Sequence, residues 1–361
     1  MVKISFIIIS VVLIFFISET FAEGNKYKIG WIIPLTGTTA DYGESIKNSV
    51  ELAIEDEKNL FENIENIFED AQNEPRLGIN AFKKLKDINK VDVVVVWGVA
   101  LCSSLAPLAD QYQIPIIGVC VNGEAAKNKE YFILGMNIYE DYNTELIKFL
   151  KNKKIKELAL IEADHIYINS LVETFKKDIN PDIKIVYRQN YPVSDQDFRA
   201  SLVKIKKLGI NNVGVFLYPG QIQTFYKQAK ALNMDLFTFG TNVFESKSEI
   251  IAANGLMEGS FYSANYVYPD WVVNYEKNFT NSTQLSFGAV SFEIAKILGV
   301  VFKGNPKSSA DIFSLIKNLP KQKGTASGPY QYTKTDQGVG YIKFPVTMKQ
   351  ITGNGFRNIV K

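Results

Sequence analysis

The chain has 361 residues, which is long enough for two domains of ordinary size. Hydrophobic residues make up 46% of the chain and charged residues 22%, a globular composition that excludes a largely disordered protein. The 40 basic and 38 acidic residues nearly balance and give a net charge of +2, which does not indicate a nucleic-acid binder.

The amino terminus has the pattern of a secretory signal peptide. Lys3 precedes the apolar run Ile4–Ile17, and Glu19–Ala22 then offers the small residues of a cleavage site. We predict a signal peptide at residues 1–22, cleaved after Ala22, with an uncleaved membrane anchor as the alternative. No later segment is expected to be apolar and long enough to cross a bilayer. We therefore predict a soluble mature protein in the periplasm or otherwise outside the cytoplasm.

Short apolar runs alternate with amphipathic segments in the first part of the mature chain. The apolar runs predict β-strands, at Tyr27–Pro34, Asn63–Asp70, Val91–Trp97, Ile114–Val119 and Tyr131–Gly135. Apolar residues at helical spacing predict helices between them, at Glu44–Lys58, Pro75–Asn89 and Leu105–Tyr112.

The same alternation then begins again. Further strands are expected at Glu157–Glu162, Lys184–Tyr191, Val213–Leu217, Asp235–Gly240 and Gly259–Asn265, with helices at Asn143–Asn152, Ser170–Lys177, Phe198–Leu208 and Gln221–Leu232. Strands that alternate with helices of this length form right-handed crossovers and parallel sheets. We therefore predict an α/β fold with two doubly wound domains.

The last third of the chain does not predict a third domain. Helices are expected at Trp271–Phe279, Gly288–Phe302 and Ala310–Asn318, followed by strands at Tyr330–Tyr332 and Gly340–Gln350. We expect these helices to return and pack on the first sheet.

Two polar corners follow neighbouring strands of the first predicted sheet. Cys102, Ser103 and Ser104 come after the third strand, and Cys120–Gly123 follows the fourth. Open α/β sheets bind their ligands at the carboxyl ends of such strands. Because Ser103 and Ser104 precede the next predicted helix, free backbone N–H groups there would favour a carboxylate. Serines in this position can also simply cap the helix.

Hydroxyl, amide and phenol groups recur after the predicted strands, whereas clusters of ionisable groups do not. The residues are Tyr42, Ser103, Ser104, Asn122, Tyr167, Tyr218 and Asn242. Such groups hold a polar ligand by hydrogen bonds without transforming it. Tyr167 and Tyr218 could also be ordinary surface residues, but their recurrence at strand ends favours the wall of a ligand cleft.

An enzyme would need reactive groups that the sequence does not supply. His165 is the only histidine, and no G-x-S-x-G, Walker A or H-E-x-x-H pattern occurs. Gly37 and Gly43 follow the first strand without the G-x-G-x-x-G fingerprint of dinucleotide-binding proteins. We predict no catalytic residue, no metal site and no cofactor. His165 fits a hydrogen-bonded or solvated surface residue, and catalysis through it is the weaker alternative.

Cys102 and Cys120 are the only cysteines of the chain. In an oxidising compartment two cysteines often pair, and these two would lie at the ends of neighbouring strands. The sequence is compatible both with a disulfide between them and with two small buried thiols.

Six short segments carry a family resemblance. They are Ile29–Gly37 (IGWIIPLTG), Tyr42–Gly43, Glu69–Ala71, Leu101–Ser104, Asp195–Phe198 and Gln228–Lys230. In this order they resemble the periplasmic type I solute-binding proteins of ABC importers, especially the leucine/isoleucine/valine-binding branch. The likeness spans essentially Tyr27 to the end of the chain.

The resemblance implies two Rossmann-like lobes, joined by three crossover strands, that close on a ligand by a hinge motion. The first lobe would comprise residues 23–140 plus 268–341, and the second residues 141–267 plus 342–361. Hinges would lie near Tyr139–Tyr142, Asn265–Pro269 and Gly340–Lys343. The implied partners of this monomer are a small-molecule ligand and ABC importer permease subunits, with no nucleic acid.

By the same likeness, the carboxylate of a ligand would meet Ser103 and the corner Cys120–Asn122. The aromatic side chains of the cleft would be Tyr42, Tyr167 and Tyr218. The full set of predicted ligand-binding residues is Tyr42, Leu101, Cys102, Ser103, Ser104, Cys120, Asn122, Tyr167, Tyr218 and Asn242.

Two positions depart from the family pattern. The family commonly has an acidic residue after the strand that ends here at Gly240, where it receives the ammonium of the ligand; this chain has Asn242, with Glu245 three residues further on. A buried ammonium without a carboxylate partner is costly. Amides, urea-like solutes and aromatic carboxylates are therefore alternatives to α-amino acids. Gln72 stands where some relatives have a cysteine that bridges to the position of Cys102.

The predicted function is an exported solute-binding protein, not an enzyme. It would capture a small carboxylate-bearing solute, an amino acid or a related compound, and deliver it to an ABC importer. A ligand-sensing regulatory protein of the same fold is the alternative.

Overall fold

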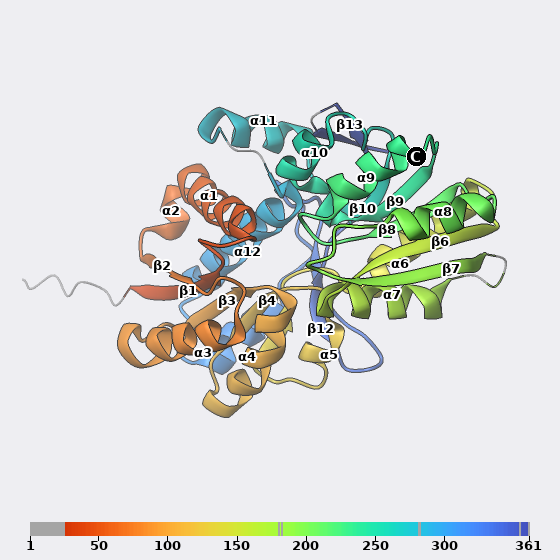
Figure 1. Cartoon of the computed structure of the whole chain (residues 1–361). Coiled ribbons are helices and arrows are strands. Elements are labelled where there is room, and N and C mark those ends of the chain that lie inside the picture. Colours follow the sequence, from red (N-terminus) through yellow and green to blue (C-terminus); the bar gives the residue numbers. More distant parts are fainter. Residues whose placement is uncertain (1–25, 180, 182, 281–282, 354, 360–361) are drawn as a thin grey trace, which may run out of the picture.

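The structure is a computed structural model that describes residues 26–179, 181, 183–280, 283–353 and 355–359. The predicted signal peptide and its cleavage site lie outside the described residues. Two α/β bodies lie side by side, and Figure 1 shows the carboxyl-terminal strands running between them. This arrangement confirms the predicted two-lobe fold class.

The first lobe contains a seven-stranded sheet in the order β11-β12-β5-β4-β3-β1-β2. Its strands are β1 (Tyr27–Ile33), β2 (Ile64–Asp70), β3 (Val93–Trp97), β4 (Ile116–Val119), β5 (Phe132–Leu134), β11 (Gln331–Lys334) and β12 (Gly340–Lys343). All neighbours are parallel except β11 and β12. Every residue of the valine-rich strand β3 is buried, as its continuous apolar run predicts for a strand covered on both faces.

Helices cover both faces of the first sheet (Figure 1). They are α1 (Ala40–Asp56), α2 (Lys58–Phe61), α3 (Pro75–Lys84) with its π-helical extension η1 (Leu85–Asn89), α4 (Val99–Tyr112), α5 (Gly123–Ala126), α12 (Leu285–Lys303) and α13 (Ser309–Lys317). Helix α12 packs along α1, and the side chain of Ile294 reaches Gly135 at the end of β5. The predicted return of the late helices to the first sheet is therefore confirmed.

Helix α12 corrects one expectation from the sequence. It has 19 residues and a mean hydropathy of 1.7, so it is long and apolar enough to cross a membrane, although no later segment was expected to be. In the structure 89% of its apolar stretch is buried inside the fold. A helix that is hydrophobic all round is typical of a core position as well as of a membrane span.

The second lobe contains another seven-stranded sheet, in the order β14-β13-β10-β9-β8-β6-β7. Its strands are β6 (Glu157–Asp164), β7 (Lys184–Pro192), β8 (Asn212–Phe216), β9 (Phe237–Thr241), β10 (Phe261–Asn265), β13 (Val346–Thr352) and β14 (Gly355–Asn358). The helical elements are α6 (Tyr139–Asn152), α7 (Ile166–Asp178), α8 (Arg199–Lys207), α9 (Ile222–Ala231), the 3-10 turn η2 (Asn242–Glu245) and α10 (Lys247–Ala253). Helix α11 (Pro269–Asn278) follows the crossover after β10 and packs on the first lobe, where Trp271 contacts Phe292 of α12 and the hydroxyl of Tyr275 accepts from Asn48 of α1. In Figure 1, α6 and α7 lie on one face of this sheet and α8, α9 and α10 on the other.

The chain passes between the two sheets three times, after β5, after β10 and after β12. The prediction of one strand at Gly340–Gln350 is wrong, because β12 and β13 belong to different sheets and the chain crosses at Phe344–Pro345. Proline has no N–H to give to a sheet, which suits it to a break between strands. The lobe boundaries predicted at 140/141, 267/268 and 341/342 stay a prediction.

Hydrogen bonds join the three connections to one another. Asn137 in the first connection donates to the carbonyl of Phe344 in the third and accepts from its N–H, both at 3.0 Å. The hydroxyl of Tyr142 donates to Oδ1 of Asn265, at the second connection, at 2.9 Å. Asn137 and Asn265 are buried, so these bonds are shielded from water. The predicted hinges thus lie at or next to residues whose hydrogen bonds join the connections, while hinge motion itself stays a prediction.

Candidate ligand-binding site

A cavity lies between the lobes, at the carboxyl ends of strands from both sheets. The space open to the centres of water molecules is about 60 Å³, which is room for several waters at roughly 15 Å³ each. The lining residues are Tyr42, Asn73, Trp97, Gly98, Val99, Val119, Cys120, Val121, His165, Tyr167, Tyr218, Asn242, Val243 and Phe287. This is the edge of the two sheets at which the strand-end rule places a ligand.

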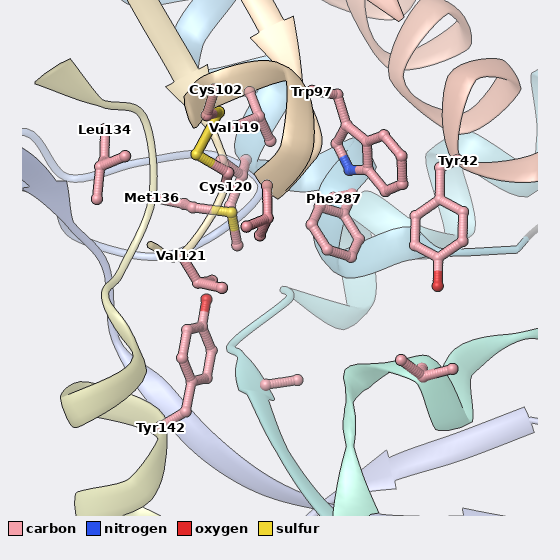
Figure 2. Packing of buried hydrophobic residues seen from close by; sticks show 14 of the residues in the cluster. Tyr42, Trp97, Cys102, Val119, Cys120, Val121, Leu134, Met136, Tyr142 and Phe287 are labelled. Atoms are coloured by element: carbon pink, nitrogen blue, oxygen red, sulfur yellow. A yellow bond between two sulfur atoms is a disulfide. The ribbon is translucent and has the colours of Figure 1, made fainter. Parts of the chain in front are cut away.

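Three aromatic rings from three elements form the first-lobe wall. Tyr42 of α1 lies 4.6 Å from Trp97 at the end of β3 and 5.3 Å from Phe287 of α12, between ring centroids. Trp97 and Phe287 meet edge to face at 5.8 Å. Figure 2 shows the three rings together, on one side of the disulfide. Tilted and edge-to-face contacts of this kind give a rigid apolar wall that can pack against a planar ligand.

The amino-terminal turn of α4 forms the next part of this wall. Gly98 precedes the helix with φ of 105°, a left-handed conformation that favours glycine. A Cβ atom at Gly98 would also collide with Oδ1 of Asn73, so the turn can be this tight only with glycine. The first intrahelical bond runs from the N–H of Cys102 to the carbonyl of Gly98. The N–H groups of the preceding turn therefore have no intrahelical acceptor.

The start of α4 contradicts one part of the sequence analysis. The helix begins at Val99, six residues before the predicted Leu105, so Ser103 and Ser104 lie inside it. The hydroxyl of Ser103 donates to the carbonyl of Val99 at 2.9 Å, and that of Ser104 to the carbonyl of Ala100 at 2.8 Å. Both expectations, a serine cap and a serine corner before the helix, are therefore wrong.

A disulfide joins Cys102 of α4 to Cys120 after β4, which settles the alternative left open by the sequence. Cys120 lines the cavity, whereas Cys102 is fully buried behind it. Figure 2 shows the bond beside Val119, Val121 and Met136. The bridge thus fixes the amino-terminal turns of α4 against the strand end that forms the neighbouring part of the wall.

The second-lobe wall consists of aromatic and amide side chains. The ring of His165 lies 4.3 Å from that of Tyr218, and the hydroxyl of Tyr167 donates to Oδ1 of Asn242 at 2.9 Å. Nδ1 of His165 accepts the N–H of Tyr167 at 3.3 Å and caps α7, so the proton of the neutral ring resides on Nε2. Burial lowers the pKa of His165 and raises the pKa of Tyr167 to about 12. Both side chains are therefore uncharged at neutral pH.

None of the described residues that line the cavity is Asp, Glu, Lys or Arg. Glu245, the acid nearest to Asn242 along the chain, is 3% exposed, and its Oε1 accepts from Nζ of Lys349 at 2.6 Å. A carboxylate paired in this way is not available to an ammonium group in the cavity. Among the described residues, no cluster of three or more His, Cys, Asp or Glu side chains could hold a metal ion.

Two buried polar atoms in the first-lobe wall have no partner within the described protein. They are Nε1 of Trp97, a donor, and Oδ1 of Asn73. A buried polar group without a partner costs about 1–3 kcal/mol. In Figure 2 the indole nitrogen is on the edge of the ring turned toward Cys120 and Val121. Trp97 thus lines the cavity and carries a buried indole N–H that has no acceptor among the described residues.

The structure brings together five of the ten predicted ligand-binding residues. Tyr42, Cys120, Tyr167, Tyr218 and Asn242 line the cavity. The other five do not: Leu101 and Cys102 are buried behind the wall, Ser103 and Ser104 bond to their own helix, and Asn122 caps α5 by accepting the N–H of Glu124. The role of all ten toward a ligand stays a prediction.

Sequence reasoning missed most of the apolar lining. Trp97, Gly98, Val119 and Val121 lie at the two strand ends that it selected, so the strand-end rule itself carried the signal. His165 also follows a strand, and the structure places it in the cavity wall, whereas its sequence context predicts a hydrogen-bonded or solvated surface residue. Phe287 belongs to α12, far along the chain from Trp97, whose ring it contacts. No local sequence pattern indicates that Phe287 lines the cavity.

Comparison with known proteins agrees with this architecture of two α/β lobes with a cavity between them. A family model described as periplasmic binding protein matches residues 26–285. The chain belongs to this family, which confirms the resemblance to periplasmic solute-binding proteins found in the sequence.

One curated relative is the Leu/Ile/Val-binding protein BraC3 of Rhizobium johnstonii. It is 27% identical over 245 residues, which cover 65% of this chain and 63% of the relative, less than two thirds of its length. A leucine binding protein, LivK of Thermotoga maritima, has a TM-score of 0.81 at 18% identity, covering 92% of this chain and 98% of that one. A solute binding protein of an ABC transporter from Rhodopseudomonas palustris BisB5, in complex with 3,4-dihydroxy benzoic acid, has a TM-score of 0.80 at 19% identity, covering 93% and 97%. At these identities the two structures show a shared fold.

Proposed function

We propose that this chain is an extracytoplasmic solute-binding protein that captures a small ring-bearing acid without an ammonium group and delivers it to an ABC importer. The observation that carries the proposal is the composition of the cavity wall. It combines six ring-bearing side chains, from Tyr42, Trp97, His165, Tyr167, Tyr218 and Phe287, with no charged residue among the described lining. Such a wall binds a small planar solute by burial and ring contacts.

The described cavity wall has no Asp or Glu side chain to pair with the ammonium group of an α-amino acid, which favours ligands without that group. An ammonium in this cavity would face the amide of Asn242 instead of a carboxylate, and Glu245 is already paired with Lys349. Desolvating an ammonium without an opposite charge is unfavourable. The names of the relatives include both leucine binding and 3,4-dihydroxy benzoic acid, so the family fold is compatible with either class.

A carboxylate on the ligand has two sets of donors on the first-lobe wall. The amino-terminal turn of α4 presents backbone N–H groups and the positive end of the helix dipole. Trp97 directly precedes Gly98, and its indole N–H has no partner among the described residues. These donors can bind an anion without a cationic side chain. We propose them in place of Ser103, whose hydroxyl donates to the carbonyl of Val99.

The proposal also implies binding without chemical change. His165 is the only histidine, and its Nδ1 is used to cap α7. Within the described residues the cavity wall offers no acid–base pair and no nucleophile next to a base. A binding role is therefore the simpler account of the same side chains.

Isothermal titration of the mature protein tests the ligand class. We expect benzoate or 4-hydroxybenzoate to bind, and leucine, isoleucine and benzamide to bind at least tenfold more weakly, a difference of about 1.4 kcal/mol. Tighter binding of leucine than of any ammonium-free acid would overturn the ligand class. Absence of binding across an extended panel of small solutes would overturn the binding function.

The indole N–H of Trp97 gives a second test. Substitution of Trp97 by Phe keeps a ring in the wall but removes the donor. We expect the dissociation constant of the bound acid to rise by roughly tenfold, the usual worth of a hydrogen bond to a charged group. Affinity for the uncharged benzamide should change less. An unchanged affinity for the acid would show that the carboxylate lies elsewhere.

A further inference from the structure

A buried ion pair lies directly behind the second-lobe wall of the cavity. Glu245 ends the turn η2, and Lys349 lies in β13; their side chains are 1% and 0% exposed. Nζ of Lys349 donates to Oε1 of Glu245 at 2.6 Å, and the hydroxyl of Tyr262 donates to the same oxygen at 3.2 Å. These three residues all belong to the second lobe.

The fourth member of the cluster comes from the first lobe. Ser286, in the first turn of α12, donates its hydroxyl to Oε1 of Glu245 at 2.7 Å and its backbone N–H to Oε2 at 3.0 Å. Lys349 also donates to the hydroxyl oxygen of Ser286 at 2.8 Å. A carboxylate from one lobe therefore caps a helix of the other, where the helix dipole favours a negative charge.

The first turn of α12 is fixed to the first lobe by separate contacts. The hydroxyl of Ser45 in α1 donates to the carbonyl of Gln284 at 3.3 Å, just before the helix begins. Gly288 lies so close to Ser45 and Ser49 that a Cβ atom there would press against both hydroxyls. The bonds from Ser286 to Glu245 thus connect two separately anchored lobes.

The residues that flank this cluster line the cavity on both sides. Asn242 and Val243 belong to the same short turn as Glu245, and Phe287 directly follows Ser286. Movement of Glu245 relative to Ser286 would therefore change the distance between the two walls of the cavity.

We propose that Glu245 is a positioning residue of the ligand site, which holds the second-lobe turn against α12 and thereby sets the spacing of the closed cavity. Lys349 neutralises this carboxylate, so that the lobes are joined by charge-assisted bonds while the cavity wall carries no free negative charge. The part of this inference that concerns affinity rests on the proposed binding function; the part that concerns the contact between the lobes does not.

The ion pair and the serine bonds have different roles in this account. An unpaired buried carboxylate would be strongly destabilising, and the bond from Lys349 offsets the cost of burying Glu245. Tyr262 and Lys349 would still hold Glu245 if Ser286 lost its hydroxyl. Substitution of Ser286 by Ala therefore weakens the contact between the lobes while it leaves the ion pair of the second lobe in place.

A matched control is available in the same lobe. Glu162 is also fully buried and paired with an arginine, Arg188, at 2.7 Å, but both residues belong to the second sheet. Arg188 is 34% exposed, so substitution of Glu162 by Gln disturbs the ion pair of a buried carboxylate with a partly exposed arginine, without touching the contact between the lobes. Glu245→Gln is the corresponding change in the proposed contact.

Hydrogen exchange of the ligand-free protein tests the contact independently of any ligand. We expect faster exchange in the first turn of α12 in Ser286→Ala and Glu245→Gln, and unchanged exchange there in Glu162→Gln. Equal exchange of this turn in the wild type and in folded Ser286→Ala would overturn the contact. If Glu245→Gln does not fold, Ser286→Ala alone decides the result.

Titration and stopped-flow dissociation with 4-hydroxybenzoate as the probe test the effect on the site. We expect Ser286→Ala to release the probe about tenfold faster, since a hydrogen bond to a charged group is lost in the closed form, and Glu162→Gln to stay within about twofold of the wild type. A wild-type release rate in Ser286→Ala would overturn the positioning role. If the wild type binds neither this probe nor other solutes, the proposed function fails, while the hydrogen-exchange result still decides the contact.

Discussion

Asn242 lines the cavity at the position where the family resemblance predicts an acidic residue for an ammonium-bearing ligand. Its Oδ1 accepts the hydroxyl of Tyr167 at 2.9 Å, and no charged residue stands beside it in the described cavity wall. An aspartate has the same size and can accept the same hydrogen bond. An aspartate at position 242 would therefore give the neutral cavity wall a negative charge that could pair with an ammonium group.

Substitution of Asn242 by Asp should therefore change the preference for charge. We expect affinity for 4-hydroxybenzoate to fall by about tenfold or more through repulsion between two buried negative charges. Leucine and isoleucine should bind more tightly than they do to the wild type. Parallel titrations of both ligand classes measure the change. Equal losses for acids and amino acids would contradict a charge effect and indicate a general disturbance of the site.

His165 should make the stability of the protein sensitive to pH. Burial lowers its pKa below the ordinary value of 6.5, while Asp164 opposes the shift. The unfolded chain therefore takes up a proton before the folded one does, and the free energy of unfolding falls as the pH drops below 6.5 through the folded pKa. His165→Asn retains a capping acceptor and cannot titrate.

Urea denaturation at several pH values between about 8 and 5 checks this expectation, because histidine titrates in that range. The difference in the free energy of unfolding between the wild type and His165→Asn should decrease as the pH falls. A difference that stays constant across this range would contradict a depressed pKa of the buried imidazole.

Helix α4 and its disulfide form the element on which the first-lobe wall depends. The helix begins at Val99 because Gly98 permits a tight left-handed turn there, and Cys102 in the second turn is bonded to Cys120 at the end of the next strand. Helical periodicity could not locate this start, because Val99, Ala100 and Leu101 suit a strand as well as a helix. The bond spans a sequence separation of 18 residues, a length for which a disulfide stabilises by about 3 kcal/mol through restriction of the unfolded chain.

The double substitution Cys102→Ala/Cys120→Ala should lower the free energy of unfolding by about 3 kcal/mol. It should also weaken the binding of the acid, because Cys120 is part of the cavity wall and α4 loses its fixed position. Denaturation of the wild type with and without reductant also compares the free energy of unfolding with and without the disulfide, and needs no substitution. If reductant changes neither the stability of the wild type nor its affinity, the disulfide is not needed to fix the wall.

At the scale of the whole molecule, the sequence predicts the strands β1 to β10 near their observed positions, because alternating buried strands and amphipathic helices are local patterns. It does not predict β14, the break between β12 and β13, or the contacts between the lobes. The pairs that join the lobes are far apart in the chain, as with Glu245 and Ser286, 41 residues apart. Hydrophobic periodicity is a local pattern and cannot predict a contact between residues so far apart in the chain. The strand-end rule therefore predicts where the cavity lies. The lack of charged side chains in its described lining and the aromatic rings that form its wall are seen only in the structure.

The three connections should determine how the lobes move relative to each other, and Asn137 is the residue that joins two of them inside the protein. Its side chain makes two hydrogen bonds to the backbone of Phe344 and is 0% exposed. Asn137→Ala leaves a buried N–H and a buried carbonyl of the third connection without these partners, at a cost of about 2–3 kcal/mol. A nearby ion pair, Lys343 with Asp141 at 2.6 Å, joins the same two connections, but the lysine is 49% exposed.

We expect Asn137→Ala to lower the free energy of unfolding and to increase the radius of gyration of the ligand-free protein in solution scattering, because the lobes are held less firmly. Lys343→Met should change the stability by less than about 1 kcal/mol, as is usual for exposed ion pairs. Addition of a binding acid should reduce the radius of gyration in both variants if closure follows ligand capture. Equal behaviour of Asn137→Ala and Lys343→Met would show that the buried bonds between the connections do not restrain the lobes.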